Sequence, residues 1–331
     1  MANGEKTFTP LAEHGKARLI ERYASLFSDL VQDPACKGET VSVQKLFTEG
    51  IHFNLVYFPL KHLGYKVITS TLAVLLGNNA LPSKFILNLG VSSKLYLEHL
   101  DDFFDGVVTA CKRYGIPLHA LDINPSVNGF IIACTLEGRC TTTPVNDNGA
   151  KPNDVICVTG NFGAAYMGLQ ILERERKIFE SEGKVKSILE RYPYLIERQL
   201  KPEARKETLM RMKELAIQPT AMTSVNDSLA YSLLQICHHS QTGCKIFAEK
   251  IPVDQETAAA AEEMYLEPLT CALNGGDDNE LLFTIPVYST DKMVHFPEVK
   301  MIGHMTGDPA EKLLIFESGS IIPLRAQGWK E

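Results

Sequence analysis

Apolar residues recur along the first 140 positions with two different spacings. The 3.6-residue period predicts helices within residues 1–30, 61–76 and 95–114. In the first of these, the repeating positions are Leu19, Tyr23, Leu26 and Leu30. Shorter apolar runs predict strands at residues 41–43, 53–58, 85–91 and 130–136. Gly115 directly follows the third helix and Pro117 comes two positions later, which is typical of a helix end.

The second half alternates in the same way. A buried strand is predicted at residues 155–159, followed by a tight turn at 160–163 and a long helix from about residue 164. Charged helices continue to residue 215, and Pro202 suits the start of one of them. A strand ending at Val225 precedes a helix from about Ser228. Further strands are predicted near residues 245–251, 281–286, 298–303 and 312–317.

Turn-forming residues lie between the two halves. Residues 141–151 contain Thr-Thr-Thr-Pro and Asn-Asp-Asn-Gly, which are linker and turn sequences. Strands alternate with helices on both sides of this segment. The fold class is therefore predicted to be α/β or α+β in two domains, residues 1–145 and 146–331.

The net charge of the chain limits the kinds of binding partner that we expect. The 331 residues carry 33 Lys and Arg against 40 Asp and Glu, a net charge of −7. Nucleic acids and anionic membranes bind basic surfaces, so neither is an expected partner. No apolar run approaches the roughly 18 residues of a membrane-spanning helix, and the first residues lack the apolar core of a signal peptide. We expect a cytoplasmic protein.

Eight cysteines are spread through the chain without a Cys-x-x-Cys pair. Most lie in apolar runs and are expected to be small buried side chains in a reducing compartment. Zinc is not expected without paired spacing. Cys237-His238-His239 is a weak alternative, because adjacent residues on a helix point in different directions.

Three stretches combine small residues with acids at junctions between elements. In residues 274–280, two glycines precede three carboxylates, which either bind a ligand or form a solvated acidic turn. In residues 224–230, the Asn-Asp-Ser run either caps a helix or holds a phosphate at its N-terminus. Asp122 follows an apolar strand and is either a ligand or a turn former.

Several motifs occur in a fixed order along the chain. They are Glu49-Gly50-Ile51-His52-Phe53, Gly64-Tyr65-Lys66, Gly149-Ala150-Lys151-Pro152-Asn153-Asp154, Asn226-Asp227-Ser228-Leu229 and Gly275-Gly276-Asp277-Asp278-Asn279-Glu280. This order resembles the thiamine-monophosphate kinase family, within the aminoimidazole-ribonucleotide-synthetase superfamily. The resemblance covers nearly the whole chain after about residue 45.

The resemblance implies a fold and a chemistry. The fold would have two α/β domains, with the N-terminal domain dimerising with a second copy through its sheet. The reaction would move a phosphoryl group from ATP to thiamine monophosphate, with Mg²⁺ ions held by aspartates. Carboxylate-held Mg²⁺ positions phosphates and neutralises their charge, which is what phosphoryl transfer needs.

The chain departs from the family pattern at acidic positions. The family Asp four residues before Glu49-Gly50 corresponds to Lys45, and the family Ser-Asp after the Gly-Tyr-Lys motif falls on Ala73-Val74. The first acid of the family Asp-x-Ser-Asp-Gly-Leu motif is Ser224 here. The family Gly-Asp-Asp-Ala-Ala loop has no counterpart in residues 32–40, and Asp147 replaces a family Arg.

Lys45 is the most consequential of these changes. An ammonium about 4 Å from Mg²⁺ would be repelled by roughly 8 kcal/mol at an effective dielectric constant of about 20. A typical metal affinity is worth about 4–8 kcal/mol. We therefore expect the full metal cluster to be lost, with Lys45 pairing with Asp122 or Asp227 in place of a metal.

Two functions remain open at this point. The first is a catalytically impaired family member that keeps a ligand-binding or regulatory role for a small phosphorylated ligand. The alternative is an active ATP-dependent small-molecule kinase with a rearranged Mg²⁺ site. By resemblance, Asp122 and Asp227 are the candidate metal or phosphate ligands. The candidate substrate-binding residues are Gly275, Gly276, Asp277, Asp278 and Glu280.

Overall fold

The computed structural model describes residues 18, 22, 40–140, 145–182 and 191–329. Most of the predicted N-terminal helix, residues 32–39 and Cys36 therefore lie outside the described residues. Within the described parts, no helix combines the length and the apolar composition needed to cross a membrane.

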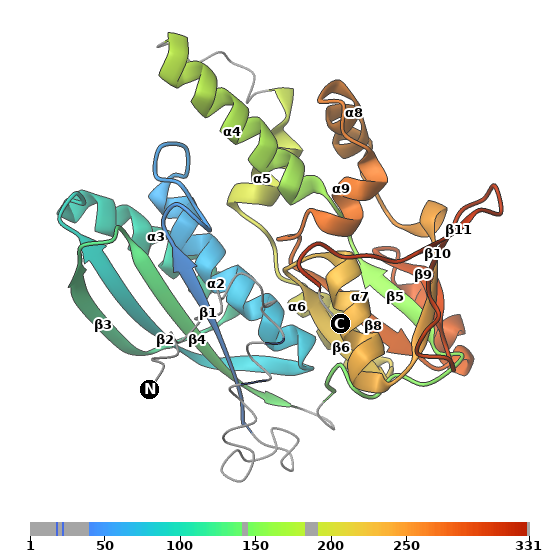
Figure 1. The fold of residues 1–331 in the computed structure, drawn as a ribbon. Helices are drawn as coiled ribbons and strands as arrows, with labels where there is room; N and C mark the ends of the chain where they lie inside the picture. The colour runs from blue at the N-terminus through green and yellow to red at the C-terminus, as the bar shows by residue number, and fades with distance from the viewer. Residues whose placement is uncertain (1–17, 19–21, 23–39, 141–144, 183–190, 330–331) are drawn as a thin grey trace, which may run out of the picture.

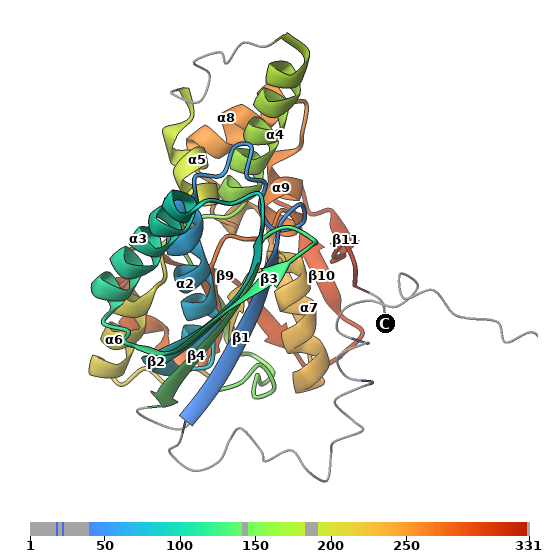
Figure 2. The same cartoon turned by 90° about the vertical axis from the view of Figure 1, so that its left-hand side faces the viewer.

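The N-terminal half is a sheet with two helices on one face (Figure 1, Figure 2). Its elements are β1 (Thr40–Thr48), α2 (Leu60–Gly77), β2 (Ala80–Ser92), α3 (Leu97–Tyr114), β3 (Leu118–Ser126) and β4 (Ile131–Cys140). The strand order is β1-β4-β2-β3. Strand β4 runs antiparallel to β1 and β2, whereas β2 and β3 are parallel. Strands β1 and β3 thus form the two edges.

The C-terminal half contains a second sheet with the strand order β11-β10-β7-β9-β5-β8-β6. Its strands are β5 (Val155–Thr159), β6 (Ala221–Val225), β7 (Gly243–Phe247), β8 (Glu280–Ile285), β9 (Val299–Thr306), β10 (Lys312–Ile315) and β11 (Ile321–Pro323). Its helices are α4 (Ala164–Glu182), α5 (Pro193–Leu200), α6 (Lys206–Glu214), α7 (Leu229–Ser240), α8 (Gln255–Glu263) and α9 (Pro268–Asn274), with short 3₁₀ segments at Ala248–Lys250 and Val287–His295. The predicted mixed α/β fold class is confirmed, and the domain division at residue 145 stays a prediction.

Local sequence explains several element ends. Gly115 ends α3 in the left-handed conformation, with φ of 69°, as its position predicts. Ser228 caps α7 by accepting a hydrogen bond from the backbone N–H of Tyr231 at 3.1 Å. The cap is therefore Ser228 and not Asn226 or Asp227. The helix start predicted at Pro202 is wrong, because Pro202 lies between α5 and α6.

Helix α2 lies between the two sheets. A Cβ atom added to Gly77 would come within 2.5 Å of the Ser224 backbone nitrogen, so the end of α2 directly abuts β6. Buried apolar side chains of α2, such as Leu72 and Leu76, belong to the same core cluster as Met222 and Phe283 of the second sheet. This shared core fixes the position of one half relative to the other, and with it the space between them.

Candidate functional site

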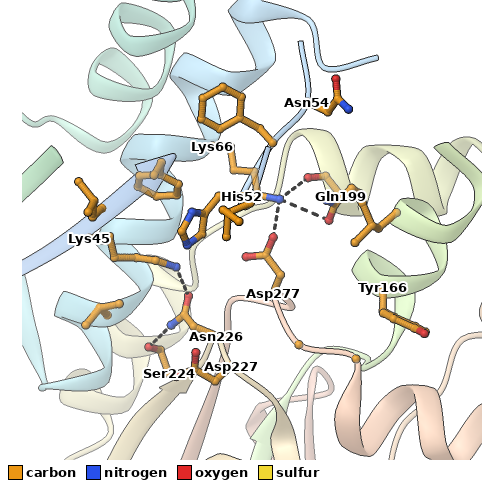
Figure 3. A pocket seen from close by; sticks show the side chains of 18 of the residues that line it. Lys45, His52, Asn54, Lys66, Tyr166, Gln199, Ser224, Asn226, Asp227 and Asp277 are labelled. Atoms are coloured by element: carbon orange, nitrogen blue, oxygen red, sulfur yellow. Dashed lines mark hydrogen bonds and ion pairs between the residues drawn. The ribbon is translucent and has the colours of Figure 1, made fainter. Parts of the chain in front are cut away.

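A cavity of about 890 Å³ lies between the two halves. Strand β1, the loop at residues 50–57 and α2 line it from the N-terminal half. Helix α4, the β6–α7 loop and the α9–β8 loop line it from the C-terminal half (Figure 3). Most of the candidate residues from the sequence meet here. Those that line the cavity are Lys45, Val74, Ser224, Asp227, Gly275, Gly276 and Asp277.

Lys45 enters the cavity from edge strand β1 (Figure 3). Its Nζ donates a hydrogen bond to Asn226 Oδ1 at 3.0 Å. The Asn226 side chain in turn donates through Nδ2 to Ser224 Oγ at 2.5 Å. A lysine and two uncharged polar groups thus occupy a region where the resemblance implies acids, and Val74 adds an apolar wall.

Lys66 joins three elements at the centre of the site. Its buried Nζ, on α2, donates to the backbone oxygen of Gln199 at 2.7 Å and to Gln199 Oε1 at 3.3 Å. It also lies 2.5 Å from Asp277 Oδ2. Burial opposes the charge of Asp277, but Lys66 and Lys45 more than offset that effect and hold the pKa of Asp277 below its usual value. Asp277 is therefore a carboxylate engaged by a lysine.

Lys66 and Gln199 are residues of the candidate site that the sequence did not single out. Lys66 stands in the Gly64-Tyr65-Lys66 motif, which is the signal that could have found it. A lysine on the buried face of a helix requires a partner, and here that partner is an acid. Gln199 carries no comparable signal, because its contribution is largely through its backbone oxygen.

The two glycines of the α9–β8 loop bring it against the β6–α7 loop. Gly276 has φ of 78°, and a Cβ atom there would lie 2.0 Å from the backbone oxygen of Asp227. The backbone N–H of Asp277 donates to the Asn226 oxygen at 2.6 Å, and that of Asn279 donates to Val225 at 2.9 Å. The paired glycines therefore allow the backbone of the α9–β8 loop to lie directly against the backbone of the β6–α7 loop.

Asp278 and Glu280 are fully buried beside the cavity and do not line it. Glu280 accepts from Arg205 Nε at 2.6 Å and Nη2 at 2.5 Å, and from Thr159 Oγ1 at 2.6 Å. Burial opposes its charge, yet Arg198 and Arg205 lower the pKa of Glu280. Asp278 accepts the backbone N–H of Gly163 at 3.1 Å, and burial raises the pKa of Asp278 to about 7. The solvated acidic turn considered above is therefore wrong.

Asp122 lies elsewhere, on exposed edge strand β3, where it accepts a hydrogen bond from Asn124 Nδ2 at 2.8 Å. Lys45 pairs with Cys134, Cys134 with Leu87, and Leu87 with Leu121. Asp122 is the next residue, so its side chain points to the other face of the sheet. It is also three strands away, or about 14 Å. Lys45 and Asp122 therefore do not pair within one chain.

The residues of the cavity do not fit a cluster of Mg²⁺ ions. Mg²⁺ requires several oxygen ligands in octahedral geometry. Asp277 is engaged by Lys66, and the Asn226 oxygen faces the Lys45 ammonium. Across the described residues as a whole, no group of three or more His, Cys, Asp or Glu side chains is arranged to hold a metal ion.

The cysteines and their histidine neighbours have other surroundings. The seven described cysteines have free thiols, and all but Cys111 are buried, as predicted. His239 Nδ1 lies 2.9 Å from Asp147 Oδ2, and the His238 ring packs edge-on against Trp329. His239 is thus paired with an acid and His238 is packed on an aromatic ring, and the centroids of the two histidine rings lie 5.5 Å apart.

The chain was compared with known proteins for similarity in sequence. None of the protein-family models matches it. Thiamine-monophosphate kinase from Aquifex aeolicus is 26% identical over 328 residues, covering 97% of this chain and 98% of the relative. The enzyme of the same name from Methanospirillum hungatei is 29% identical over 262 residues, covering 79% and 78%.

Solved structures agree on the fold. The Aquifex aeolicus thiamine monophosphate kinase structure superposes with a TM-score of 0.79 at 24% identity, over 95% of this chain and 100% of that chain. Hydrogenase maturation protein HypE gives 0.69 at 15% identity, over 97% of both chains. The fold is thus of the aminoimidazole-ribonucleotide-synthetase type. The ordered motifs, and relatives that align along nearly the whole length, make this chain similar to the thiamine-monophosphate kinases.

Proposed function

We propose that this protein binds a small phosphorylated ligand in the cavity between its halves and is impaired in the ATP-dependent phosphorylation of thiamine monophosphate. The observation that carries the proposal is Lys45, whose ammonium projects into the cavity and contacts Asn226 at 3.0 Å. A fixed cation there repels the Mg²⁺ ions that would neutralise the transferred phosphoryl group.

The neighbouring positions support the same proposal. Val74 offers no oxygen, and the Ser224 hydroxyl accepts a hydrogen bond from Asn226. Two of the acids implied by the resemblance, Asp122 and Asp227, do not share a site within one chain, because only Asp227 lines the cavity. Phosphoryl transfer depends almost entirely on positioning and charge stabilisation, so a site without its metals retains binding and loses rate.

The cavity is large enough for a substrate. A volume of about 890 Å³ falls within the range of small-molecule sites, which is about 300–1,000 Å³. A structure described as AaThiL complexed with AMPPCP and TMP superposes on this chain with a TM-score of 0.81 at 24% identity, over 96% of this chain and 98% of that chain. Thiamine monophosphate and ATP analogues are therefore the first ligands to test.

An active kinase is the second candidate. It is favoured by Asp227 and Asp277, two carboxylates that line the cavity, and by relatives named as kinases that align along nearly the whole chain. Such an enzyme would bind ATP with Mg²⁺ at a rearranged site. Asp277 would have to exchange Lys66 for the metal.

Binding and turnover separate the two candidates. We expect thiamine monophosphate to raise the unfolding temperature, because a ligand that binds the folded state stabilises it. We expect no thiamine diphosphate above background with Mg²⁺-ATP, even at stoichiometric protein, while an active family enzyme assayed in parallel gives product. Product formation that scales with the amount of this protein would establish the second candidate instead.

We also propose that the protein is a homodimer that pairs through its N-terminal sheet. All but the last residue of β3 are exposed, including the apolar Leu118, Leu121 and Ile123, and one edge of this strand has no partner among the described strands. Light scattering should give twice the chain mass. Ile123→Lys should shift the mass toward the monomer, and a monomeric wild-type protein would contradict the proposal.

A further inference from the structure

We infer that the Asp277 carboxylate is an internal anion that occupies the phosphate position of the cavity, and that a phosphorylated ligand displaces it from Lys66 in order to bind. This inference rests on the proposed ligand-binding function and names the residue that limits the affinity. The ligand class is a phosphate or pyrophosphate ester of a small molecule.

Asp277 lies between the open cavity and the Lys66 ammonium (Figure 3). Lys66 Nζ donates to two oxygens of the buried Gln199, at 2.7 Å and 3.3 Å, and lies 2.5 Å from Asp277 Oδ2. The Lys66 side chain is 3% exposed, whereas that of Asp277 is 36% exposed. An anion that enters the cavity therefore meets Asp277 first, and Asp277 is the acceptor of Lys66 that such an anion can replace.

Positive charge from the N-terminal half converges on this carboxylate. Lys66 is its ion-pair partner, and Lys45 and His52 also lie close enough to act on it. Burial opposes the ionised form of Asp277, but these three groups more than offset that effect and lower its pKa. An anion is therefore already present where these positive groups meet, and a ligand phosphate competes with it for the same charge.

The charge balance of the cavity agrees with this competition. Two lysines and three carboxylates are among the side chains that line it: Lys45, Lys66, Glu173, Asp227 and Asp277. With histidine neutral, these groups leave an excess of negative charge, which does not attract a phosphate. Neutralising Asp277 balances the lysines against the two remaining carboxylates and leaves Lys66 without its anionic partner. A phosphate can then take that place.

The backbone at residue 277 is held independently of the side chain. Its N–H donates to the Asn226 oxygen at 2.6 Å, and its carbonyl oxygen accepts from Asn279 Nδ2 at 2.7 Å. Its φ of 62° is left-handed, a conformation that Asn and Asp adopt more readily than most other residues with a side chain. Displacement of the carboxylate therefore needs only a rotation of the side chain, and Asp277→Asn is compatible with the same backbone.

Calorimetry of the wild-type protein and Asp277→Asn tests this inference, with pyrophosphate, thiamine monophosphate and thiamine as probes in EDTA. We expect Asp277→Asn to bind the two phosphorylated probes roughly 10- to 100-fold more tightly than wild type, which is the usual value of a hydrogen bond to a charged group. Thiamine, which has no phosphate, should bind the two proteins with affinities within a few-fold of each other. Circular dichroism before each titration shows whether the variant is folded.

Asp105→Asn is the matched control. Asp105 also pairs with a lysine of α2, since its Oδ2 lies 2.6 Å from Lys61 Nζ, but it does not line the cavity. This variant should bind every probe like wild type. The double variant Lys66→Met, Asp277→Asn should lose the gain in affinity of Asp277→Asn, because it lacks the ammonium that the phosphate would contact.

A crystal structure of the wild-type protein with pyrophosphate gives a test that needs no variant. We expect a phosphate oxygen within hydrogen-bonding distance of Lys66 Nζ, with the Asp277 side chain turned away from it. Pyrophosphate bound in the cavity beside an intact ion pair of Lys66 and Asp277 would overturn the inference.

The calorimetry can also overturn it. Equal or weaker binding of the phosphorylated probes by Asp277→Asn would show that the carboxylate does not compete with them. A gain that persists in the double variant would show that Lys66 is not the phosphate contact. Either result leaves the proposed function intact if the wild-type protein binds thiamine monophosphate. If neither wild type nor Asp277→Asn binds a phosphorylated probe, in EDTA or in Mg²⁺, the inference and the proposed function are both wrong.

Discussion

Asp278 is a residue of the candidate site whose ionisation the fold changes. Its carboxyl group is fully buried, accepts the Gly163 backbone N–H and lies 4.0 Å from Arg198 Nη2. Burial raises its pKa from the usual 3.8 to about 7, and Arg198 offsets only part of this. The folded protein therefore holds a proton that the unfolded chain releases above about pH 4.

This difference predicts a pH dependence of stability. The stabilising contribution of protonated Asp278 is present below the unfolded pKa and is lost as the pH rises through about 7. Asp278→Asn, which cannot ionise, should gain stability relative to wild type between pH 5 and 7, by at most about 1.4 kcal/mol per pH unit. Urea unfolding of both proteins across this range measures the difference. Parallel stability curves would show that Asp278 does not titrate there.

At the scale of elements, the pairing of two loops builds one wall of the cavity. The α9–β8 loop contributes Gly276 and Asp277, and the β6–α7 loop contributes Asn226 and Asp227. Backbone hydrogen bonds join them at 2.6 Å and 2.9 Å. The wall therefore depends on how closely the two backbones approach one another.

Gly276→Ala should push the loops apart. The new Cβ atom would lie 2.0 Å from the Asp227 oxygen, and the φ of 78° disfavours any side chain. We expect a loss of about 3 kcal/mol or more in unfolding free energy, together with weaker ligand binding because Asn226 is displaced. Gly319→Ala is the control, since φ is 82° there and no atom lies within 4 Å. It should cost only about 1–2 kcal/mol, and equal losses for the two variants would contradict the close-approach explanation.

The elements that local sequence could predict are those with their own end signals. Helix α3 ends at Gly115, and β5 is a continuous apolar run between polar residues. The strand predicted at residues 53–58 is wrong, because Asn54 Oδ1 accepts the Val56 N–H at 3.0 Å and turns the chain. Helices α8 and α9 were not predicted. Helix α8 is rich in alanine, which shows little apolar periodicity.

Residues of the candidate site could be predicted only where they lie in or next to a recognisable sequence motif. Asp227 and Asp277 stand in ordered motifs, Lys45 lies four residues before another, and all three line the cavity. Asp122 was a candidate because it follows an apolar strand, but its position depends on strand order and on which face of the sheet it occupies. A shift of one residue in register reverses that face, and local sequence does not determine it.

At the scale of the whole molecule, α2 joins the two halves, and we expect them to unfold as one cooperative unit. Its apolar side chains share a core with the second sheet, and Lys66 links it to Gln199 and Asp277. The single tryptophan, Trp329, packs against Tyr231 in the C-terminal half, so its fluorescence reports on that half. Circular dichroism reports on both. The two signals should follow the same urea transition in the wild-type protein.

Lys66→Met should lower the urea midpoint of the fluorescence transition and that of the circular dichroism transition together. It leaves the Asp277 carboxylate without the cation 2.5 Å away, which we expect to cost about 2–4 kcal/mol. The double variant Lys66→Met, Asp277→Asn removes both charges and should cost less than the sum of the single variants by about 1–2 kcal/mol. Lys84→Met, which breaks a partly exposed pair with Glu137, should change stability by less than about 1 kcal/mol. Separate transitions for fluorescence and circular dichroism in the wild-type protein would mean that the halves unfold independently. Additive single effects would mean that Lys66 acts through packing alone, and the cavity wall would then need another explanation for the ionised state of Asp277.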